Sequence, residues 1–437
     1  MIGKLYKRSA LETKESLWSI GGETLDRNYA DYHAYKQWLG PLGAKRIRLQ
    51  AGWARTEAVP GRHEFDWLDR IVDDAISRGV QPWMELSYGN PAYSGGGDAQ
   101  LAGGIPHSTE ALEAWDRWVE AMVLRYRDRV HEWEIWNEVD HKDCVPVKGY
   151  VDLYLRSAAI LRRHQPEARL WALALAGDVS YAEEFVSLMK AAGKLDLVDA
   201  ITFHGYPPDP DCLRLYHELK LMMQRQGVDI PLRQGETGAP SQNSCGALRD
   251  LDWTPLQQAK WNSRRLIVHA AREIPMNLFA MADMHYNRPD ALSGLNPKGL
   301  IECRSDLTAV GPKPAYTAAQ HVFSVFNLSV RPEAGLAEGL FPAAPERLRV
   351  HGFVQEKTGA RFVAYWLGGA QPEASEVRES LVFSEKAGMK HPVWVDLLTG
   401  EVHLPEQNRI PLWDGPLLLA EVEALDFEPL EDESMAG

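Results

Sequence analysis

The chain has 437 residues, and its 47 basic and 61 acidic side chains leave a formal net charge of −14. This balance argues against nucleic acid or an anionic membrane as a partner, because such partners select basic surfaces. No apolar run reaches the roughly 18 residues that could span a bilayer. The composition, 45% hydrophobic and 25% charged, is ordinary for a globular protein and excludes disordered, collagen-like and disulfide-scaffold chains. The length exceeds the usual limit for one hydrophobic core, so we expect a large domain and a smaller one.

The amino-terminal segment MIGKLYKRSALETKES has basic residues but no apolar stretch behind them, so it does not resemble a signal peptide. We therefore expect a cytoplasmic protein or the mature form of a secreted one. The four cysteines are Cys144, Cys212, Cys245 and Cys303. They form no CxxC pair, which argues against a zinc site and favours free thiols. All four are predicted in loops at the same end of the fold, so a disulfide between two of them is conceivable.

Short β-rich apolar runs alternate with amphipathic segments from about residue 17 to about residue 330. The runs are Leu17–Gly22, Ala44–Gln50, Val80–Ser87, Val130–Trp136, Arg169–Ala174, Ala200–His204, Pro231–Gly235 and Met276–Ala282. Apolar residues at i, i+3, i+4 spacing predict helices over Phe65–Ile76, before Gly79, and over Leu112–Tyr126, after the capping residues Ser108 and Thr109.

Eight alternations of strand and helix over roughly 300 residues indicate a (β/α)8 TIM barrel. A doubly wound open sheet is the rival architecture. Its usual Gly-rich phosphate loop is missing, because Gly21-Gly22 is followed by Glu23 and Thr24 and not by GxGxxG.

The pattern changes after residue 331, where short strands alternate with turns that contain Gly, Pro and Glu. The expected strands are Arg347–Val354, Ala360–Leu367, Glu379–Phe383, His391–Asp396, Glu401–Leu404 and Leu417–Leu425. We therefore predict a barrel over residues 1–330 and a small antiparallel β-sandwich over residues 331–437. The last barrel helix is expected to start at Pro312–Pro314, and Arg331–Pro345 is the expected linker.

Two glutamates stand at the ends of predicted strands. The fourth strand continues into Asn137-Glu138, and the seventh ends in Gly235-Glu236. Active sites of such barrels lie at the carboxyl ends of the strands, and strands four and seven face each other across the mouth. Two facing carboxyl groups about 5–5.5 Å apart are what retaining glycoside hydrolysis needs, one as proton donor and one as nucleophile.

These segments resemble known enzymes. WEIWNE (133–138) is similar to the acid/base motif of glycoside hydrolase clan A, and QGETG (234–238) is similar to the nucleophile segment of that clan. HGYP (204–207) and the segment from Phe65 to Ser87 resemble family 39, the β-xylosidase and α-L-iduronidase family. The resemblance covers most of the barrel and implies a retaining β-glycosidase.

The resemblance implies roles for individual positions. Glu138 would be the general acid/base and Glu236 the nucleophile. Asn137 would hydrogen-bond the 2-hydroxyl of the sugar, an interaction that tightens in the transition state.

Three further positions match residues beside the nucleophile. Arg48 would hold Glu236 ionised by lowering its pKa, although a structural ion pair is the alternative role. Tyr206 would donate a hydrogen bond to the nucleophile, and His204 would line the same wall.

The chain departs from the family at two positions. Gln50 stands where family 39 usually has a histidine, and Phe279 stands where the family has a tryptophan platform under the sugar. Asp283 matches the aspartate of the family. Trp53 and Tyr88 follow strand ends and are therefore additional candidates for stacking against a sugar.

Two other functions compete with hydrolysis. A metal-dependent sugar enzyme could use Glu85, His204, Asp283 and His285, of which His285 is also a candidate substrate-binding residue. A carbohydrate-binding protein on a decayed barrel is the non-enzymatic alternative, and the presence of both glutamates argues against it.

We expect a carbohydrate as the only partner and no cofactor, and the oligomeric state cannot be predicted from the sequence. The charge of −14 favours a neutral sugar over a strongly acidic polysaccharide. The long segments Gly89–His107 and Ala239–Trp253 could wall a pocket, which favours an exo-acting enzyme.

Overall fold

The structure, a computed structural model, describes residues 1–141, 145–243, 245–286, 294–326, 329–385 and 388–430. Eight parallel strands close into a barrel in the order β2 (Trp18–Gly21), β3 (Arg46–Gln50), β4 (Gln81–Leu86), β5 (Glu132–Ile135), β6 (Arg169–Leu175), β7 (Ala200–His204), β8 (Leu232–Thr237) and β9 (Met276–Leu278). Each strand overlaps one predicted run, and β2 pairs with both β3 and β9. The (β/α)8 prediction is confirmed, and the closure excludes an open doubly wound sheet.

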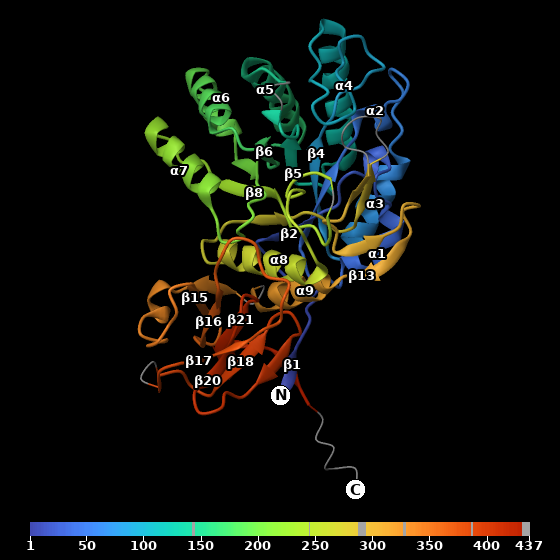
Figure 1. Ribbon diagram of the computed structural model, residues 1–437. Coiled ribbons are helices and arrows are strands. Elements are labelled where there is room, and N and C mark those ends of the chain that lie inside the picture. The colour runs from blue at the N-terminus through green and yellow to red at the C-terminus, as the bar shows by residue number, and fades with distance from the viewer. Residues whose placement is uncertain (142–144, 244, 287–293, 327–328, 386–387, 431–437) are drawn as a thin grey trace.

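Helices surround the barrel (Figure 1). They are α1 (Tyr32–Leu39), α2 (Trp53–Thr56), α3 (Asp66–Ser77), α4 (Thr109–Tyr126), α5 (Val147–His164), α6 (Val179–Ala191), α7 (Arg214–Gln226), α8 (Pro255–Ala270) and α9 (Pro314–Phe326). The α4 helix begins where the capping pattern predicted, because the Ser108 hydroxyl accepts a hydrogen bond from the Ala111 N–H. None of the described helices combines the length and the apolar character that crossing a membrane requires.

Between β9 and α9 the chain forms two short hairpins. One pairs β10 (Met284–Tyr286) with β11 (Gly294–Asn296), and the other pairs β12 (Ile301–Cys303) with β13 (Ala309–Pro312). The sequence pattern did not indicate these strands, because three or four residues are too few to show a period of two. They extend the wall of the barrel mouth beyond the eighth strand.

The second unit is built on an eight-stranded antiparallel sheet and packs beside the barrel, against α8 and α9 (Figure 1). Its order is β14 (Val330–Pro332), β15 (Leu348–Gln355), β16 (Arg361–Leu367), β21 (Leu417–Glu421), β18 (Pro392–Asp396), β19 (Glu401–His403), β1 (Gly3–Leu5) and β22 (Phe427–Pro429). The sheet thus includes β1, which the predicted division at residue 330 places with the barrel. A two-stranded antiparallel sheet of β17 (Glu379–Val382) and β20 (Arg409–Leu412) forms a second layer.

The alternating residues of β16 and β21 separate the two faces of this sheet. Phe362, Ala364 and Leu418 join the hydrophobic core that continues into the barrel. Val363 and Leu417 pack instead with the two-stranded β17–β20 sheet. The predicted antiparallel β domain therefore packs on the barrel through one face and is covered by the two-stranded sheet on the other.

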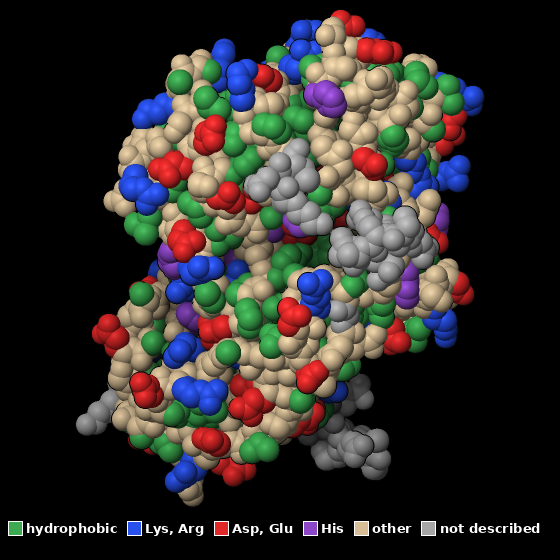
Figure 2. Space-filling view, turned by 45° about the horizontal axis from the view of Figure 1, so that its top comes forward, with side chains coloured by type: hydrophobic (Ala, Val, Ile, Leu, Met, Phe, Trp, Pro, Cys, Tyr) green, Lys and Arg blue, Asp and Glu red, His purple; other side chains and the backbone are tan. Residues whose placement is uncertain are grey.

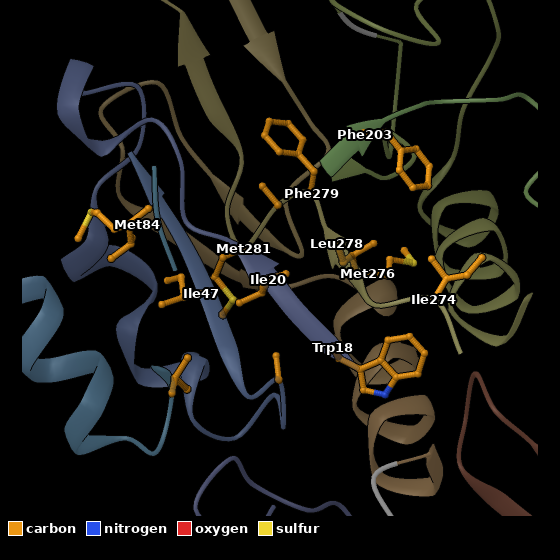
Figure 3. Packing of buried hydrophobic residues seen from close by; sticks show 14 of the residues in the cluster. Trp18, Ile20, Ile47, Met84, Phe203, Ile274, Met276, Leu278, Phe279 and Met281 are labelled. Atoms are coloured by element: carbon orange, nitrogen blue, oxygen red, sulfur yellow. The ribbon is translucent and has the colours of Figure 1, made fainter. Parts of the chain in front are cut away.

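The two ends of the barrel differ in what they pack against. Figure 3 shows Trp18 and Phe279 at opposite ends of the side chains packed around β9. Trp18 begins β2 and stacks on Phe323 of α9, with ring centroids 5.8 Å apart, so the amino-terminal end of the barrel is packed. Phe279 follows β9 at the carboxyl end, where it lines a cavity.

Cys212 and Cys303 are free thiols, as expected. Cys144 lies outside the described residues.

Candidate active site

A cavity of about 600 Å³ lies at the carboxyl ends of the barrel strands. Among its lining residues are six that the sequence singled out, namely Tyr88, Asn137, Glu138, Tyr206, Glu236 and Phe279. Arg48 and His204 lie just behind this lining, with 0% and 1% of their surfaces exposed. The structure therefore brings together eight of the predicted site residues.

The two strand-end glutamates face each other in this cavity. An oxygen of Glu138, an oxygen of Glu236 and a ring nitrogen of His204 all lie within 4.8 Å of one another. Glu236 belongs to β8, whereas Glu138 follows β5 with a φ of 46° and is fixed by its N–H, which donates to Ala174 O at 2.9 Å. Carboxyl groups this close suit double displacement, because inverting enzymes keep theirs roughly 6.5–9.5 Å apart.

Both carboxylate oxygens of Glu236 accept a hydrogen bond. Arg48 Nη1 donates to Oε1 at 2.6 Å, and the Tyr206 hydroxyl donates to Oε2 at 2.8 Å. Burial works to raise the pKa of Glu236, but His204, Arg48 and Tyr206 outweigh it and lower that pKa. The geometry therefore keeps Glu236 ionised, as a nucleophile must be.

His204 lies between the two glutamates. Its Nδ1 is 3.0 Å from Glu138 Oε1 and 3.6 Å from Glu236 Oε2. Burial alone would lower its pKa, but the carboxylates of Glu236 and Glu138 raise it. The imidazole thus contacts both carboxyl groups and holds Glu138 toward the reacting centre.

Arg48 is the centre of a buried cluster of carboxylates. Besides Glu236, it contacts Glu23 at 2.9 Å, Glu134 at 2.7 Å and Glu85. Burial raises the pKa of Glu23 to about 7 and that of Glu85 to about 8, against the attraction of Arg48. One guanidinium cannot neutralise four buried carboxylates, so protons remain on Glu23 and Glu85 in the neutral range.

Asn137 connects this cluster to the cavity surface. Arg48 Nη2 donates to Asn137 Oδ1 at 2.8 Å, and Asn137 Nδ2 donates to the Tyr88 hydroxyl at 2.7 Å. Tyr88 in turn lies under the Arg27 guanidinium, 4.7 Å from its ring centroid. The side chain of Asn137 is thus fixed at the cavity wall beside the nucleophile, where the predicted contact with a sugar hydroxyl can form.

The structure does not support a role at the cavity for three predicted residues. Trp53 is fully buried in an aromatic cluster with Trp115 and Trp118, so its ring has no free face for a sugar. Asp283 pairs with the Lys313 ammonium at 2.6 Å, and His285 Nε2 lies 3.0 Å from Cys303 O. None of these three side chains is part of the cavity lining.

The metal hypothesis is also not supported. Of its proposed ligands, Glu85 is engaged with Arg48 and Ser87, and Asp283 with Lys313. In the described part of the chain, the cluster that could offer three ligand atoms to a cation is Glu138, His204 and Glu236. The oxygens of Glu236 are already occupied by Arg48 and Tyr206, which favours an organic substrate over a cation.

Several cavity residues were missed by the sequence analysis: Glu23, Arg27, Tyr29, Tyr286, Asn296 and Lys298. Glu23 could have been found, because it follows Gly21-Gly22 at the end of a predicted strand, as Glu138 and Glu236 do. Asn296 and Lys298 follow no predicted strand, so the sequence carried no such signal for them.

Comparisons with known proteins agree with this geometry. Residues 51–223 match the family described as Glycosyl hydrolases family 39. The chain is related to that family. A family 39 glycoside hydrolase from Bacteroides cellulosilyticus WH2 shares the fold with a TM-score of 0.71 at 18% identity, over 95% of this chain and 83% of that one. A monomeric β-xylosidase from Caulobacter crescentus CB15 does so with a TM-score of 0.61 at 14% identity, over 98% of both chains.

Two curated relatives match shorter segments. An aryl-phospho-beta-D-glucosidase from Bacillus subtilis is 27% identical over 143 residues, which are 31% of this chain and 28% of the relative. A beta-xylosidase from Caldicellulosiruptor saccharolyticus is 28% identical over 188 residues, which are 38% of each chain. The chain therefore spans less than two fifths of the length of these two relatives.

Proposed function

We propose that the protein is a retaining β-glycoside hydrolase. The observation that carries the proposal is the pair Glu138 and Glu236, with one oxygen of each within 4.8 Å of the other in a cavity of about 600 Å³. The relation to family 39 supports the same reaction class, and the curated relatives are named as glycosidases.

In the first step, the Glu236 carboxylate attacks the anomeric carbon while Glu138 gives its proton to the glycosidic oxygen. The bond from the anomeric carbon to the leaving oxygen breaks, and a covalent glycosyl ester forms on Glu236. Arg48 and Tyr206, which hold the two oxygens of this carboxylate, fix it for in-line attack. Asn137 Nδ2 lies at the wall where a 2-hydroxyl would be bound.

In the second step, Glu138 acts as a base and removes a proton from the water that attacks the same carbon. The ester bond to Glu236 breaks, and the sugar leaves with its original anomeric configuration. His204, beside both carboxyl groups, stabilises Glu138 whenever it carries a negative charge.

The substrate proposed is a carbohydrate cut from the end of a chain or from an aglycone. Leu101 and Gly246, from the two long loops that follow β4 and β8, both line the cavity. A cavity of about 600 Å³ that is walled by loops suits one or two sugar rings, whereas a polymer cut internally needs an open groove.

The test uses two variants with opposite expected products. Glu236→Ala should lower the turnover of 4-nitrophenyl β-glycosides by at least about 10³-fold, and added azide should rescue it as an α-glycosyl azide. Glu138→Ala should lose turnover less on this activated leaving group, and azide should then give the β-glycosyl azide. Full activity of Glu236→Ala, or the same azide product from both variants, would contradict the proposal.

A further inference from the structure

Three lysines in the described part of the chain are buried, and their ammonium groups have very different surroundings. Lys260 Nζ bonds Asp414 Oδ1 at 2.5 Å and two carbonyl oxygens at 2.7 and 3.0 Å. Lys313 Nζ bonds Asp283 Oδ1 at 2.6 Å, Ser241 Oγ at 2.9 Å and Pro297 O at 3.1 Å. Each of these two groups uses its three donors and has a carboxylate beside it.

Lys298 lacks such partners. Only 2% of the residue is exposed, and its Nζ makes one long hydrogen bond among the described residues, to Asn296 Oδ1 at 3.4 Å. No carboxylate of the described chain lies within the 4.0 Å of an ion pair with it. It also lies near the ring of Tyr206, with the centroid 5.5 Å away.

This ammonium belongs to the cavity wall beside the proposed nucleophile. A buried charge without a partner is costly, and a fold retains it when a ligand supplies the missing partner. Burial lowers the pKa of Lys298 to about 8, with nearby Cys245 and Glu236 opposing the shift. The side chain therefore still carries its charge at neutral pH.

The position of Lys298 indicates which part of a sugar it would meet. Arg48 donates to both Glu236 Oε1 and Asn137, whereas Tyr206, whose ring centroid is 5.5 Å from the Lys298 ammonium, donates to Glu236 Oε2. The anomeric carbon has two ring neighbours, C2 and the ring oxygen, and the ring oxygen leads to C5. If Asn137 marks the side of C2, Lys298 stands on the side of the ring oxygen and of the substituent on C5.

We propose that Lys298 is a specificity-determining residue that binds an anionic group at C6 of the sugar, which is a carboxylate in a uronic acid or a phosphate in a 6-phosphosugar. The inference rests on the proposed glycosidase function and replaces the neutral sugar that the net charge favoured. That charge does not describe the site, because acidic and basic side chains are interspersed on the surface (Figure 2), whereas the cavity wall holds an ammonium that forms no ion pair with the described residues.

The kinetic test compares three substrates that differ only at C6, namely the 4-nitrophenyl β-D-glucoside, its 6-phosphate and the β-D-glucuronide. The wild type should hydrolyse one of the two anionic substrates with a kcat/KM about 10- to 100-fold above that of the glucoside. The favoured anion distinguishes phosphate from carboxylate. Lys298→Met, which keeps the length of the side chain, should lower kcat/KM for the favoured anionic substrate much more than for the glucoside and so remove this preference, and Lys298→Arg should restore part of it.

The matched control is Lys220→Met, which removes the same charge from the exposed face of α7, where Lys220 pairs with Asp229 at 3.0 Å. It should leave the preference intact. A wild type that favours the neutral glucoside, or a Lys298→Met that lowers all three rates alike, would overturn the inference while leaving the glycosidase function standing.

Binding gives a result that does not depend on turnover. Calorimetry with glucuronic acid, glucose 6-phosphate and glucose should show tighter binding of one anion to the wild type, and loss of that difference in Lys298→Met. Absence of hydrolysis with all three substrates would count against the proposed function. Equal binding of the three sugars would count against the role of Lys298.

Discussion

Two buried charge clusters lie near the mouth of the barrel, and they differ in stoichiometry. Arg48 forms ion pairs with four carboxylates, whereas Lys313, among the described residues, forms an ion pair with Asp283 and completes its hydrogen bonds with Ser241 Oγ and Pro297 O. Asp283 also accepts the Gly299 N–H at 3.0 Å. The Lys313 cluster is balanced within the protein, and the Arg48 cluster is not.

This imbalance distinguishes the proposed active site from a structural ion pair. Burial raises the pKa values of Glu23 and Glu85, whereas His204, Arg48 and Tyr206 lower that of Glu236, so the pKa values within the Arg48 cluster move apart. Pairing of one cation with one anion offers no such range of protonation states. Asp283, although it matches a family residue, therefore belongs to a structural ion pair with Lys313, whereas Arg48 belongs to the proposed active site.

The largest effect is expected from Arg48→Met, which breaks the unbalanced cluster. Removal of the guanidinium leaves buried carboxylates uncompensated, so stability should fall by about 3–5 kcal/mol and kcat by about 10²–10³-fold. Because Arg48 lowers the pKa of Glu236, the acid limb of kcat/KM should move to higher pH. Arg48→Lys keeps the charge and should keep the fold. If the pH profile of kcat/KM were unchanged in both Arg48→Lys and Arg48→Met, Arg48 would not be what lowers the pKa of Glu236.

The second prediction concerns the balanced pair. Lys313→Met should destabilise the protein by about 3–5 kcal/mol, because Asp283 is left buried without its partner, while the kcat of the folded fraction stays close to that of the wild type. Chemical denaturation and active-site titration measure the two quantities. Asp283→Asn combined with Lys313→Met should recover most of the stability. A large loss of kcat in folded Lys313→Met would remove the distinction between the clusters.

The smallest effect is expected from Glu23→Gln and appears in the pH dependence of stability. The pKa of Glu23 is about 7 in the fold against an ordinary value of 4.5. Between these values the folded state holds a proton that the unfolded state has lost, so the contribution of Glu23 to stability is present below pH 4.5 and is lost as the pH rises to 7. Glu23→Gln should therefore lose less stability than the wild type between pH 5 and pH 7.5, by about 1–3 kcal/mol.

Thermal melts at the two pH values measure this difference. Glu64→Gln is the matched control, since the side chain of Glu64 is 56% exposed and should leave the wild-type dependence unchanged. Equal shifts in the melting temperature for Glu23→Gln and the wild type would show that Glu23 does not hold a proton in the fold.

Much of the site follows from one local rule, namely that a polar residue at the end of a barrel strand lies at the mouth. The rule found Glu138 and Glu236, and applied to Gly21-Gly22 it would also have found Glu23. It failed for Trp53, because a residue after a strand can turn either into the mouth or back onto the helices. Trp53 turns back and packs against Trp115 and Trp118 of α4.

The sequence by itself determined the barrel, the antiparallel domain after it and the two glutamates, because hydrophobic periodicity and the order of strands are local properties of the chain. Only the tertiary structure decided the charge balance at each site. Arg48 meets carboxylates from β4, β5 and β8, and Lys298 comes from a segment after β11 that no period predicts. The protonation state and the hydrogen-bond partners of a buried group depend on neighbours far apart in sequence. That dependence is the physical reason why the net charge led to the expectation of a neutral sugar, whereas the surroundings of Lys298 led to the proposal of an anionic one.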